Sequence, residues 1–315
     1  MSGALTFFTA SDVYNLPEVK NEYVKVGISD IDRNKMRGLM KTDVSIVTGM
    51  SGSGKSSLIS GMVLDAVDNG HKVMVYSGEL SPKRFMSWLY LQAAGKDYVE
   101  ADSEYPNKFF TRRNVREQIN EWLGKNFYLH NNRQGHDFTK MFERIKQLVS
   151  SKGMDLLILD NLMTIDVDLN EKERDQWQKQ AQFIQLLKSY AGEANVHIVL
   201  VCHPSKIRGI MRVTDLEGSG KIRNAVDNIF IMHRVNDDFK RLAKQDLGWT
   251  DDNYNFKATN LLEIAKDRDG GVADYFIRLN FETETKRLRN TPVENKVYGW
   301  QKEEWLQGVI ETPFD

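Results

Sequence analysis

Cysteine is almost absent from this 315-residue chain, since Cys202 is its single example, and proline occurs only six times. One cysteine excludes an intramolecular disulfide and any zinc site built from several cysteines, which fits a reducing compartment. Long apolar runs are missing as well, and the first residues show no basic segment followed by an apolar one. We therefore expect neither a membrane-spanning segment nor export.

The chain also lacks an excess of charge of either sign. Its 43 Lys and Arg residues against 44 Asp and Glu residues give a formal net charge of -1. Any nucleic-acid-binding surface must then come from local clusters of basic residues rather than from the overall charge. No internal repeat or low-complexity tract occurs. The length is sufficient for a large buried core.

A glycine-rich loop is the most informative feature that is present. Residues 49–56 read Gly-Met-Ser-Gly-Ser-Gly-Lys-Ser, the G-x4-G-K-S spacing of a phosphate-binding loop. In such a loop the backbone N–H groups face phosphate oxygens, the lysine reaches the terminal phosphates, and the last serine ligates Mg²⁺. The motif predicts a site for ATP and Mg²⁺, with the nucleotide-binding residues Gly49, Met50, Ser51, Gly52, Ser53, Gly54, Lys55, Ser56 and Ser57.

Short β-rich runs alternate with helical patterns along the chain. The apolar run Val44–Thr48 precedes the loop and a helical pattern, Ser57–Val67, follows it. Residues Gln176–Tyr190 have helical spacing and are interpreted as a crossover helix. The alternation predicts an α/β fold with a mainly parallel central sheet flanked by helices. The further strands that we expect are Val73–Ser77, Phe127–His130, Leu156–Asp160, His197–Cys202, Asn228–His233, Leu261–Lys266 and Tyr275–Leu279.

Two carboxylates follow predicted strands. Asp160 ends a buried strand, where P-loop NTPases place the carboxylate that holds the Mg²⁺ hydration shell, so we assign the metal to Ser56 and Asp160. The next residue is Asn161 rather than a second carboxylate, so the group that orients the attacking water must lie elsewhere. Glu79 is the candidate, because the carboxyl ends of neighbouring parallel strands share one edge of the sheet.

Five motifs, in this order, resemble one family. After the phosphate-binding loop come Gly78-Glu-Leu-Ser81, the Leu-Leu-Ile-Leu-Asp-Asn stretch, Cys202-His-Pro204 and Lys266-Asp-Arg-Asp-Gly270. Together they look like the RecA-like P-loop NTPase core of DnaB-type replicative helicases, over about residues 25–285. The histidine at position 203 is similar to the Twinkle and phage primase-helicase branch, whereas bacterial DnaB has glutamine there.

The resemblance implies roles for the matching residues. His203 would contact the γ-phosphate and report its loss to the adjacent DNA-binding loop, as an imidazole at a strand end can do. Arg268 would be an arginine finger supplied to a neighbouring subunit, with Lys266 beside it. Arg234 would pack on the base and joins the nucleotide-binding set. The catalytic residues that we predict are Glu79, Lys55, Arg268, Lys266 and His203.

Residues 204–223 form a locally basic segment with several glycines. In the family this is the mobile central-channel loop, where basic side chains meet the phosphates of a single strand. The DNA-binding residues that we expect there are Lys206, Arg208, Arg212, Lys221 and Arg223. A second segment, residues 163–175, also approaches DNA in the family, but it is acidic here, which argues against that role.

The chain is expected to have three regions. Residues 1–30 contain a short predicted helix, Ser11–Val19, capped by Ser11, that is a candidate for linking subunits. Residues 31–288 form the RecA-like ATPase domain. Residues 289–315 form an acidic, aromatic tail, which resembles tails by which phage helicases recruit a polymerase; a primase or a loader is the other partner considered for it.

These features predict an ATP- and Mg²⁺-dependent replicative DNA helicase, expected to be a hexameric ring that translocates 5′ to 3′ on single-stranded DNA. The expected location is the cytoplasm of a bacterium or of a virus-infected host cell, with no membrane partner. Three alternatives stay open. They are a RecA- or KaiC-like repair or recombination ATPase that does not unwind, a P-loop kinase, and a replisome adaptor that binds ATP but hydrolyses it negligibly.

Overall fold

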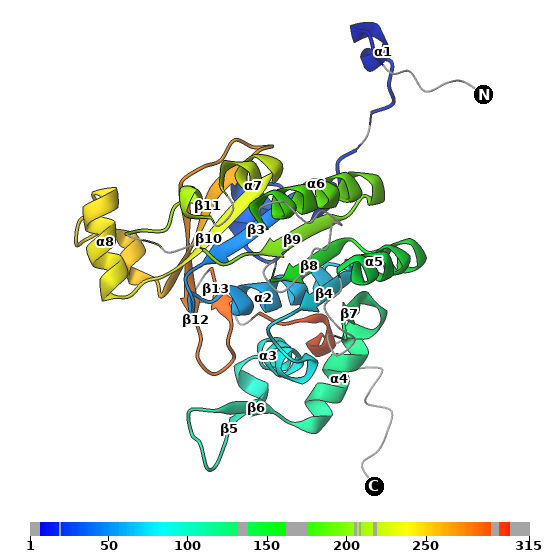
Figure 1. Cartoon of the computed structure of the whole chain (residues 1–315). Helices are drawn as coiled ribbons and strands as arrows, with labels where there is room; N and C mark the ends of the chain where they lie inside the picture. The colour runs from blue at the N-terminus through cyan, green and yellow to red at the C-terminus, as the bar shows by residue number, and fades with distance from the viewer. Residues whose placement is uncertain are drawn as a thin grey trace.

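A computed structural model describes residues 7–18, 20–131, 138–161, 176–204, 207, 209–216, 219–290 and 296–302, with the backbone alone at 138, 139, 176–180, 219 and 221. Its centre is a nine-stranded sheet in the order β13-β12-β11-β10-β3-β9-β8-β4-β7 (Figure 1). Neighbours from β10 to β7 pair in parallel, and β11, β12 and β13 continue the sheet in antiparallel pairs. The strands are β3 (Val44–Gly49), β4 (Val73–Ser77), β7 (Phe127–Leu129), β8 (Leu156–Asp160), β9 (His197–Val201), β10 (Asn228–Arg234), β11 (Asn260–Asp267), β12 (Tyr275–Phe281) and β13 (Leu288–Arg289).

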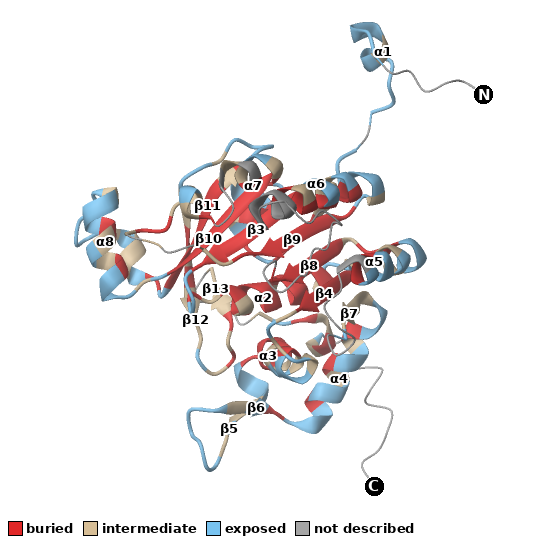
Figure 2. Ribbon diagram, in the orientation of Figure 1, coloured by how far each residue is buried: buried red, intermediate tan, exposed pale blue. Residues whose placement is uncertain are grey.

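Helices cover both faces of this sheet. Because successive side chains of a strand point to opposite faces, Val47 and Val75 pack in the core beneath α2, α3 and α4, whereas Ile46 and Met74 pack beneath α5, α6 and α7. Figure 2 shows the strands between these layers as almost wholly buried. The helices of the two layers are α2 (Lys55–Asp68), α3 (Pro82–Ala94), α4 (Arg113–Leu123), α5 (Phe138–Lys152), α6 (Gln176–Ala194) and α7 (Ser219–Ala225).

Two short strand pairs and a further helix lie outside the central sheet and its two helical layers. The pair β1 (Tyr23–Val24) and β2 (Leu39–Met40) and the pair β5 (Val99–Ala101) and β6 (Phe109–Thr111) are antiparallel. Helix α8 (Asp237–Leu247) packs with Trp249 and Phe276 in a separate apolar cluster beside β10 and β11. Short helical turns occur at Asp30–Asn34, Lys96–Tyr98, Gly124–Asn126, Val213–Asp215, Tyr254–Lys257 and Gly299–Gln301.

The predicted α/β class and the predicted strands are confirmed, each strand within two residues at either end. β8 and β9 are buried at every position, as their nearly continuous apolar runs predicted. The crossover helix α6 is also present, with Phe183 and Leu187 in the core. Leu186 lies at the edge of the buried stripe that Phe183, Leu187 and Ala191 form, and it is 42% exposed.

The N-terminal helix α1 (Ala10–Tyr14) is shorter than predicted and has a different cap. Thr9, not Ser11, is the N-cap residue: its Oγ1 accepts from the Asp12 N–H at 3.2 Å, and the Asp12 carboxylate accepts from the Thr9 N–H at 2.7 Å. Pro17 disfavours helical geometry at the residue before it, so the helix ends early. No residue of α1 is buried, and Figure 1 shows it projecting away from the sheet.

The tail was expected to begin at residue 289, and that boundary is too early. Tyr298 and Trp300 are each 2% exposed and belong to the core beneath α2, α3 and α4. Trp300 Nε1 donates to the carbonyl oxygen of Ala93 at 3.1 Å. Acidic neighbours suggested a solvated tail, but indole burial outweighs their charge, so the packed body reaches Lys302. The later tail residues, Trp305 and Phe314 among them, lie outside the described residues. None of the described helices is long and apolar enough to cross a bilayer.

His197, the first residue of β9, is fully buried and neutral. Its Nδ1 lies 2.7 Å from the carbonyl oxygen of Met40, and its Nε2 lies 2.9 Å from Oγ of Ser45. Burial lowers the pKa of His197 to about 4, although the bond to Met40 opposes the shift. Because the unfolded chain binds a proton at higher pH than the folded chain does, stability is lost as the pH falls from about 6.5 toward 4.

We expect acidification from about pH 7.5 to about pH 5 to remove roughly 2 kcal/mol of unfolding free energy through His197 alone. A His197→Gln variant lacks this group, so its urea midpoint should fall less over the same range than the midpoint of the unchanged protein. Arg241→Gln on the exposed face of α8 serves as the matched control, since it removes no buried titratable group and should keep the full pH dependence. Equal pH dependence in His197→Gln and the unchanged protein would contradict this interpretation.

Candidate nucleotide-binding site

The glycine-rich loop joins β3 to α2 at the carboxyl edge of the parallel strands. Gly49, Gly52 and Gly54 have φ values of 147°, 74° and 102°, in the region that residues with a Cβ disfavour. A Cβ at Gly49 would lie 2.4 Å from the carbonyl oxygen of Met232 on the neighbouring strand β10. Helix α2 begins at Lys55, so its N-terminal N–H groups face the loop, as an anion site requires.

Lys55 lies buried at the base of the loop. Its Nζ donates to the carbonyl oxygens of Gly49 at 2.7 Å and Met50 at 3.1 Å. Burial lowers the pKa of Lys55, and the negative charges of Glu79 and Asp160 act in the opposite direction. The two predicted carboxylates therefore lie within electrostatic range of the loop lysine.

Asp160 ends β8 and pairs in register with Ser77, which ends β4. It is 5% exposed, and Oγ of Ser77 donates to its Oδ2 at 3.5 Å. Burial, together with the smaller effect of the Glu79 charge, raises the pKa of Asp160 to about 6. A cation bound beside Asp160 would favour the ionised carboxylate, so this environment suits a metal ligand.

Glu79, Asn161 and His203 form one hydrogen-bonded group at the same edge. Oε1 of Glu79 accepts from Nδ2 of Asn161 at 2.5 Å and lies 2.7 Å from Nε2 of His203. Burial opposes ionisation of Glu79, but the bonds from His203 and Asn161 outweigh it and lower the pKa of the carboxyl. Glu79 is thus a carboxylate at neutral pH, the form that can orient a water molecule.

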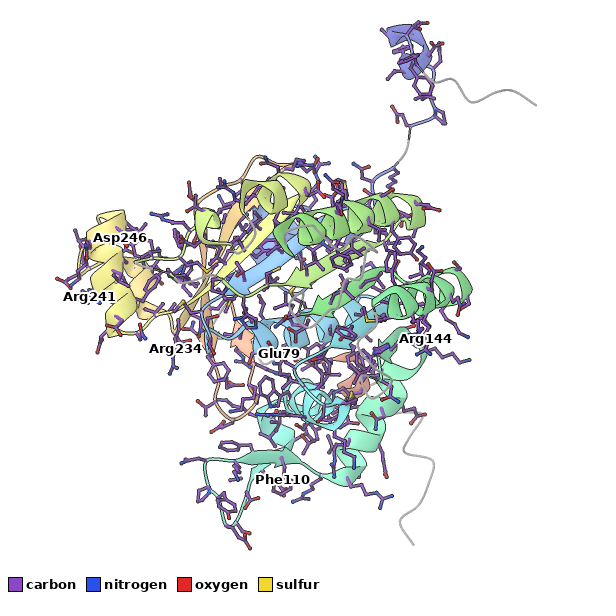
Figure 3. The ribbon with its side chains drawn as sticks, in the orientation of Figure 1. Glu79, Phe110, Arg144, Arg234, Arg241 and Asp246 are labelled. Carbon is purple, nitrogen blue, oxygen red and sulfur yellow. The ribbon has the colours of Figure 1, made fainter. Side chains whose placement is uncertain are left out.

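Two asparagines join the site that sequence reasoning had not assigned to it. Asn161 holds Glu79, as described above. Asn260, the first residue of β11 and 5% exposed, donates through Nδ2 to the Ser53 carbonyl oxygen of the loop at 2.8 Å. Its strand partner is Arg234, the exposed last residue of β10, so Arg234 also lies beside the loop (Figure 3). Neither asparagine is charged or belongs to a recognisable sequence motif. Only the fold brings Asn161 and Asn260 to the site, so no sequence signal could have identified them.

The arrangement fits a nucleoside triphosphate with Mg²⁺. Within the loop, Oγ of Ser53 is buried with no hydrogen-bond partner among the described residues, so a polar group is available there. Oxygen atoms from Ser56 and Asp160 suit Mg²⁺, which keeps several waters and needs few protein ligands. Across the described part of the chain, no three His, Cys, Asp or Glu side chains gather into a separate metal site.

The predicted finger residues lie at the opposite edge of the sheet. Asp267 pairs with Asn228 at the start of β10, and Asn228 pairs with Ser45 at the start of β3. Gly49 lies at the other end of β3, and a strand rise of about 3.3 Å per residue separates the two ends by roughly 16 Å. Arg268, which follows Asp267, is therefore remote from the phosphate-binding loop of its own chain.

Lys266 and Arg268 both bond to the C-terminal end of α7. Nζ of Lys266 donates to the carbonyl oxygens of Arg223 and Val226, each at 2.7 Å, and Nη2 of Arg268 donates to that of Asn224 at 2.6 Å. Burial lowers the pKa of Lys266, and the nearby charge of Arg268 lowers it further. Arg223, which we had grouped with the DNA-binding residues, thus lies beside the finger residues.

The basic segment is only partly described. Lys206, Arg208, the side chain of Lys221 and the acidic residues 163–175 lie outside the described residues. The expected mobility of the whole segment does not fit its described part, because four of its apolar side chains are buried in the body: Ile210, Met211, Leu216 and Ile222. Arg212 lies within this anchored stretch, and its N–H donates to Oδ2 of Asp215 at 2.7 Å.

The fold and the site define a P-loop ATPase with a RecA-like core. The chain belongs to the DnaB-like helicase C-terminal domain family, whose model matches residues 24–290. It is therefore a nucleotide-dependent ATPase and an ATP-dependent replicative DNA helicase, and a hexameric ring is the expected assembly of this family. Membership favours the helicase prediction over the recombinase-like, kinase and adaptor alternatives.

Two solved structures share the fold. One, described as an ATPase domain, has a TM-score of 0.67 and 18% identity, over 86% of this chain and 92% of that one. The other, a DnaB-like replicative helicase described with its interactions with primase, has a TM-score of 0.66 and 18% identity, over 85% of this chain. This chain covers 61% of that second protein's length. Comparison with curated protein sequences found no match.

We expect Glu79→Gln to lower the rate of ATP hydrolysis by roughly 100-fold or more, because the amide cannot accept the proton of an oriented water. Nucleotide affinity should change little, since Glu79 is not part of the loop. The rate is measured by phosphate release and the affinity by fluorescence of a labelled nucleotide. Exposed Glu117 on α4 is the matched control, and Glu117→Gln should hydrolyse normally. Normal hydrolysis by Glu79→Gln would remove it from the catalytic set.

Proposed function

We propose that ATP binds at the loop between β3 and α2, that Ser56 and Asp160 hold Mg²⁺, and that six copies form a ring on single-stranded DNA. One observation carries this proposal, namely that the residues predicted to be catalytic are divided between the two ends of the parallel strands. Because Arg268 and the loop lie at opposite ends of β3, a complete site needs two subunits. A closed ring gives every loop a neighbour's arginine.

Hydrolysis is an in-line attack of water on the γ-phosphorus, in which the new bond from the water oxygen forms as the bond to the ADP oxygen breaks. Glu79 orients that water and accepts its proton. Lys55 and the neighbouring subunit's arginine at position 268 stabilise negative charge on the phosphoryl oxygens, with Lys266 beside that arginine. Mg²⁺, when bound, neutralises charge on the β- and γ-phosphates.

His203 links hydrolysis to movement on DNA. It bonds to Glu79 at the end of β9, and the next residue, Pro204, opens the basic segment and pairs with Leu216. Loss of the γ-phosphate changes the negative charge facing the Glu79–His203 pair and so alters the bond between them. A shift of His203 then moves the segment that carries the proposed DNA-binding residues, Lys206, Arg208, Arg212, Lys221 and Arg223.

The nucleotide base is proposed to lie beside β10. Arg234 ends this strand, is exposed, and is next to the loop through its pairing with Asn260. A planar guanidinium can stack on an aromatic base. This position supports Arg234 as a base-packing residue.

The ends of the chain are proposed to serve assembly and recruitment. Residues 1–30 would link subunits through α1, and the ATPase domain would extend from residue 31 through Lys302. Support for the linking role comes from apolar side chains around α1 that stay at least half exposed, namely Phe7, Phe8, Val13, Tyr14 and Leu16. The tail beyond Lys302 is the proposed site for a primase, polymerase or loader.

The proposed ring is tested by measuring ATP hydrolysis with and without single-stranded DNA across a protein-concentration series, with particle masses counted in the same samples. We expect turnover to rise strongly with DNA and to follow the six-subunit species. Lys55→Ala should abolish turnover. DNA-independent turnover by a monomer would contradict the proposal.

Arg268→Ala should lower turnover by roughly 10³-fold or more, the scale of losing an arginine finger, while nucleotide binding and assembly persist. Phosphate release, nucleotide fluorescence and particle mass measure the three properties. Arg241→Ala, on the exposed face of α8, is the matched control and should behave as the unchanged protein. An Arg268→Ala protein with normal turnover would exclude the finger assignment.

Deletion of residues 1–20 should reduce the fraction of six-subunit particles at a given concentration and leave the melting temperature of the monomer unchanged, because no residue of α1 is buried. Mass photometry and differential scanning fluorimetry measure the two quantities. A Tyr14→Ser variant should weaken assembly in the same direction. Unchanged assembly after the deletion would exclude the linking role.

A further inference from the structure

A buried carboxylate, Asp227, lies between the end of α7 and the start of β10. Its side chain is only 3% exposed. Oδ2 accepts from the Val44 N–H at 3.0 Å and from Nζ of Lys188 on α6 at 2.5 Å, and Oδ1 accepts from Nη1 of Arg268 at 3.0 Å. The Asp227 carboxylate therefore bonds to three parts of the molecule. These are strand β3, which leads to the loop, helix α6, and Arg268, the proposed finger residue.

Arg268 is held by three bonds at this point. Besides the bond to the Asp227 carboxylate, its backbone N–H donates to the Asp227 carbonyl oxygen at 3.1 Å, and Nη2 donates to the Asn224 carbonyl oxygen at 2.6 Å. Two of these bonds orient the guanidinium itself. Half of the Arg268 side chain remains exposed, so its outer N–H groups face the solvent.

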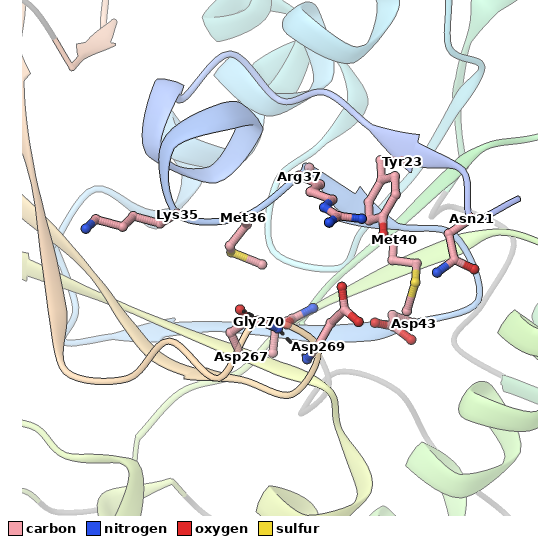
Figure 4. Close-up of a pocket in the computed structure, with 12 residues that line it drawn as sticks. Asn21, Tyr23, Lys35, Met36, Arg37, Met40, Asp43, Asp267, Asp269 and Gly270 are labelled. Atoms are coloured by element: carbon pink, nitrogen blue, oxygen red, sulfur yellow. Dashed lines mark hydrogen bonds between the residues drawn. The ribbon is translucent and has the colours of Figure 1, made fainter.

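The charges around Asp227 are balanced within a small volume. Lys188 also bonds to Asp43 at 2.9 Å, so two buried carboxylates share one lysine and one arginine. Burial raises the pKa of Asp43, and the bond to Lys188 opposes this. Asp43 also lines a cavity of about 240 Å³ together with Asp269, the residue after Arg268 (Figure 4). Of the two carboxylates, Asp227 is the one that bonds to Arg268, whereas Asp43 bonds to Lys188.

We propose that Asp227 is a positioning residue for the reaction in the neighbouring subunit, because it fixes the guanidinium of Arg268 in the orientation that meets that subunit's γ-phosphate. This inference rests on the proposed function, in which the finger acts between subunits. The free guanidinium would sample many rotamers, whereas the docked one needs no reordering when negative charge develops. Asp227 touches no substrate itself.

The structure also offers a different route by which Asp227 could affect turnover. Its bond to the Val44 N–H holds the start of β3, the strand that leads to the phosphate-binding loop of the same chain. Loss of Asp227 through that route would damage the subunit's own loop. The two routes differ in which subunit's site is impaired, so a mixing experiment separates them.

The experiment uses rings of two differently tagged chains, co-expressed and purified through both tags. One chain carries Lys55→Ala, which removes its own loop lysine but keeps its finger. The other chain carries Asp227→Asn, with an intact loop. If Asp227 serves the finger, sites that combine the loop of the second chain with the finger of the first are complete.

We expect Asp227→Asn rings alone to show a kcat about 10- to 100-fold below normal with nucleotide affinity unchanged, a smaller loss than removal of the arginine. Mixing with Lys55→Ala chains should raise turnover well above that of either parent. Asp43→Asn is the matched control, since Asp43 is buried and bonded to Lys188 rather than to Arg268, and it should keep normal kcat.

Rings that combine Arg268→Ala chains with Lys55→Ala chains are the reference. Asp227 is unchanged in them, so their turnover tests only whether each site is shared between two subunits. If these rings regain turnover but the Asp227→Asn rings do not, the positioning role is wrong and the shared site stands. If neither mixture regains turnover, the shared site fails and the inference fails with it. Asp227→Glu, which keeps the buried charge but displaces the carboxylate, is assayed in the same mixtures should the asparagine variant not fold, with the same expected rescue.

Discussion

Parallel pairing of β4, β8, β9 and β3 is the constraint on which the site depends. Each strand is nearly or wholly buried, and each ends at the same edge of the sheet, so the residues that follow the four strands are brought together. The loop after β3, Glu79 after β4, Asp160 at the end of β8 and His203 after β9 meet there although they are far apart in sequence. Apolar packing between two helical layers holds the strands in register. Because the polar residues of the site follow these strands, the same packing determines the distances between them.

The same sheet separates the proposed finger, Arg268, from the phosphate-binding loop. β11 returns antiparallel beside β10, so its last residues lie at the amino edge, where Arg268 is docked on Asp227 and on the end of α7. On the proposed function, one subunit therefore carries the phosphate-binding loop of one site and, at the opposite end of its strands, the finger of another. Helix α7 contains the last residues of the basic segment, and its C-terminal end accepts the bonds from Lys266 and Arg268, so the proposed finger and the proposed DNA-contacting segment meet at one helix. On the proposed function, that helix would couple the nucleotide state of one subunit to DNA contact in its neighbour.

Much of the fold was predictable because burial leaves a clear pattern in sequence. Continuous apolar runs marked β8 and β9, and the spacing of the glycine-rich loop marked the nucleotide site. Polar partners were harder to predict from the sequence. Asn161, Asn260 and Asp227 bond to residues that are remote in sequence, and no local sequence pattern indicates such bonds. The C-terminal boundary was missed for a related reason, since burial of an indole among acidic residues depends on a surface supplied by α3.

Each nucleotide site, on this mechanism, is built from two subunits. The most direct measurement is a cryo-electron microscopy structure of the protein with single-stranded DNA, Mg²⁺ and a slowly hydrolysed ATP analogue. We predict Arg268 of one subunit within hydrogen-bonding distance, about 3 Å, of the γ-phosphate held by the loop of the next. The same subunit should keep Arg268 bonded to its own Asp227. A nucleotide enclosed by one subunit, with Arg268 turned away from every phosphate, would contradict the two-subunit site.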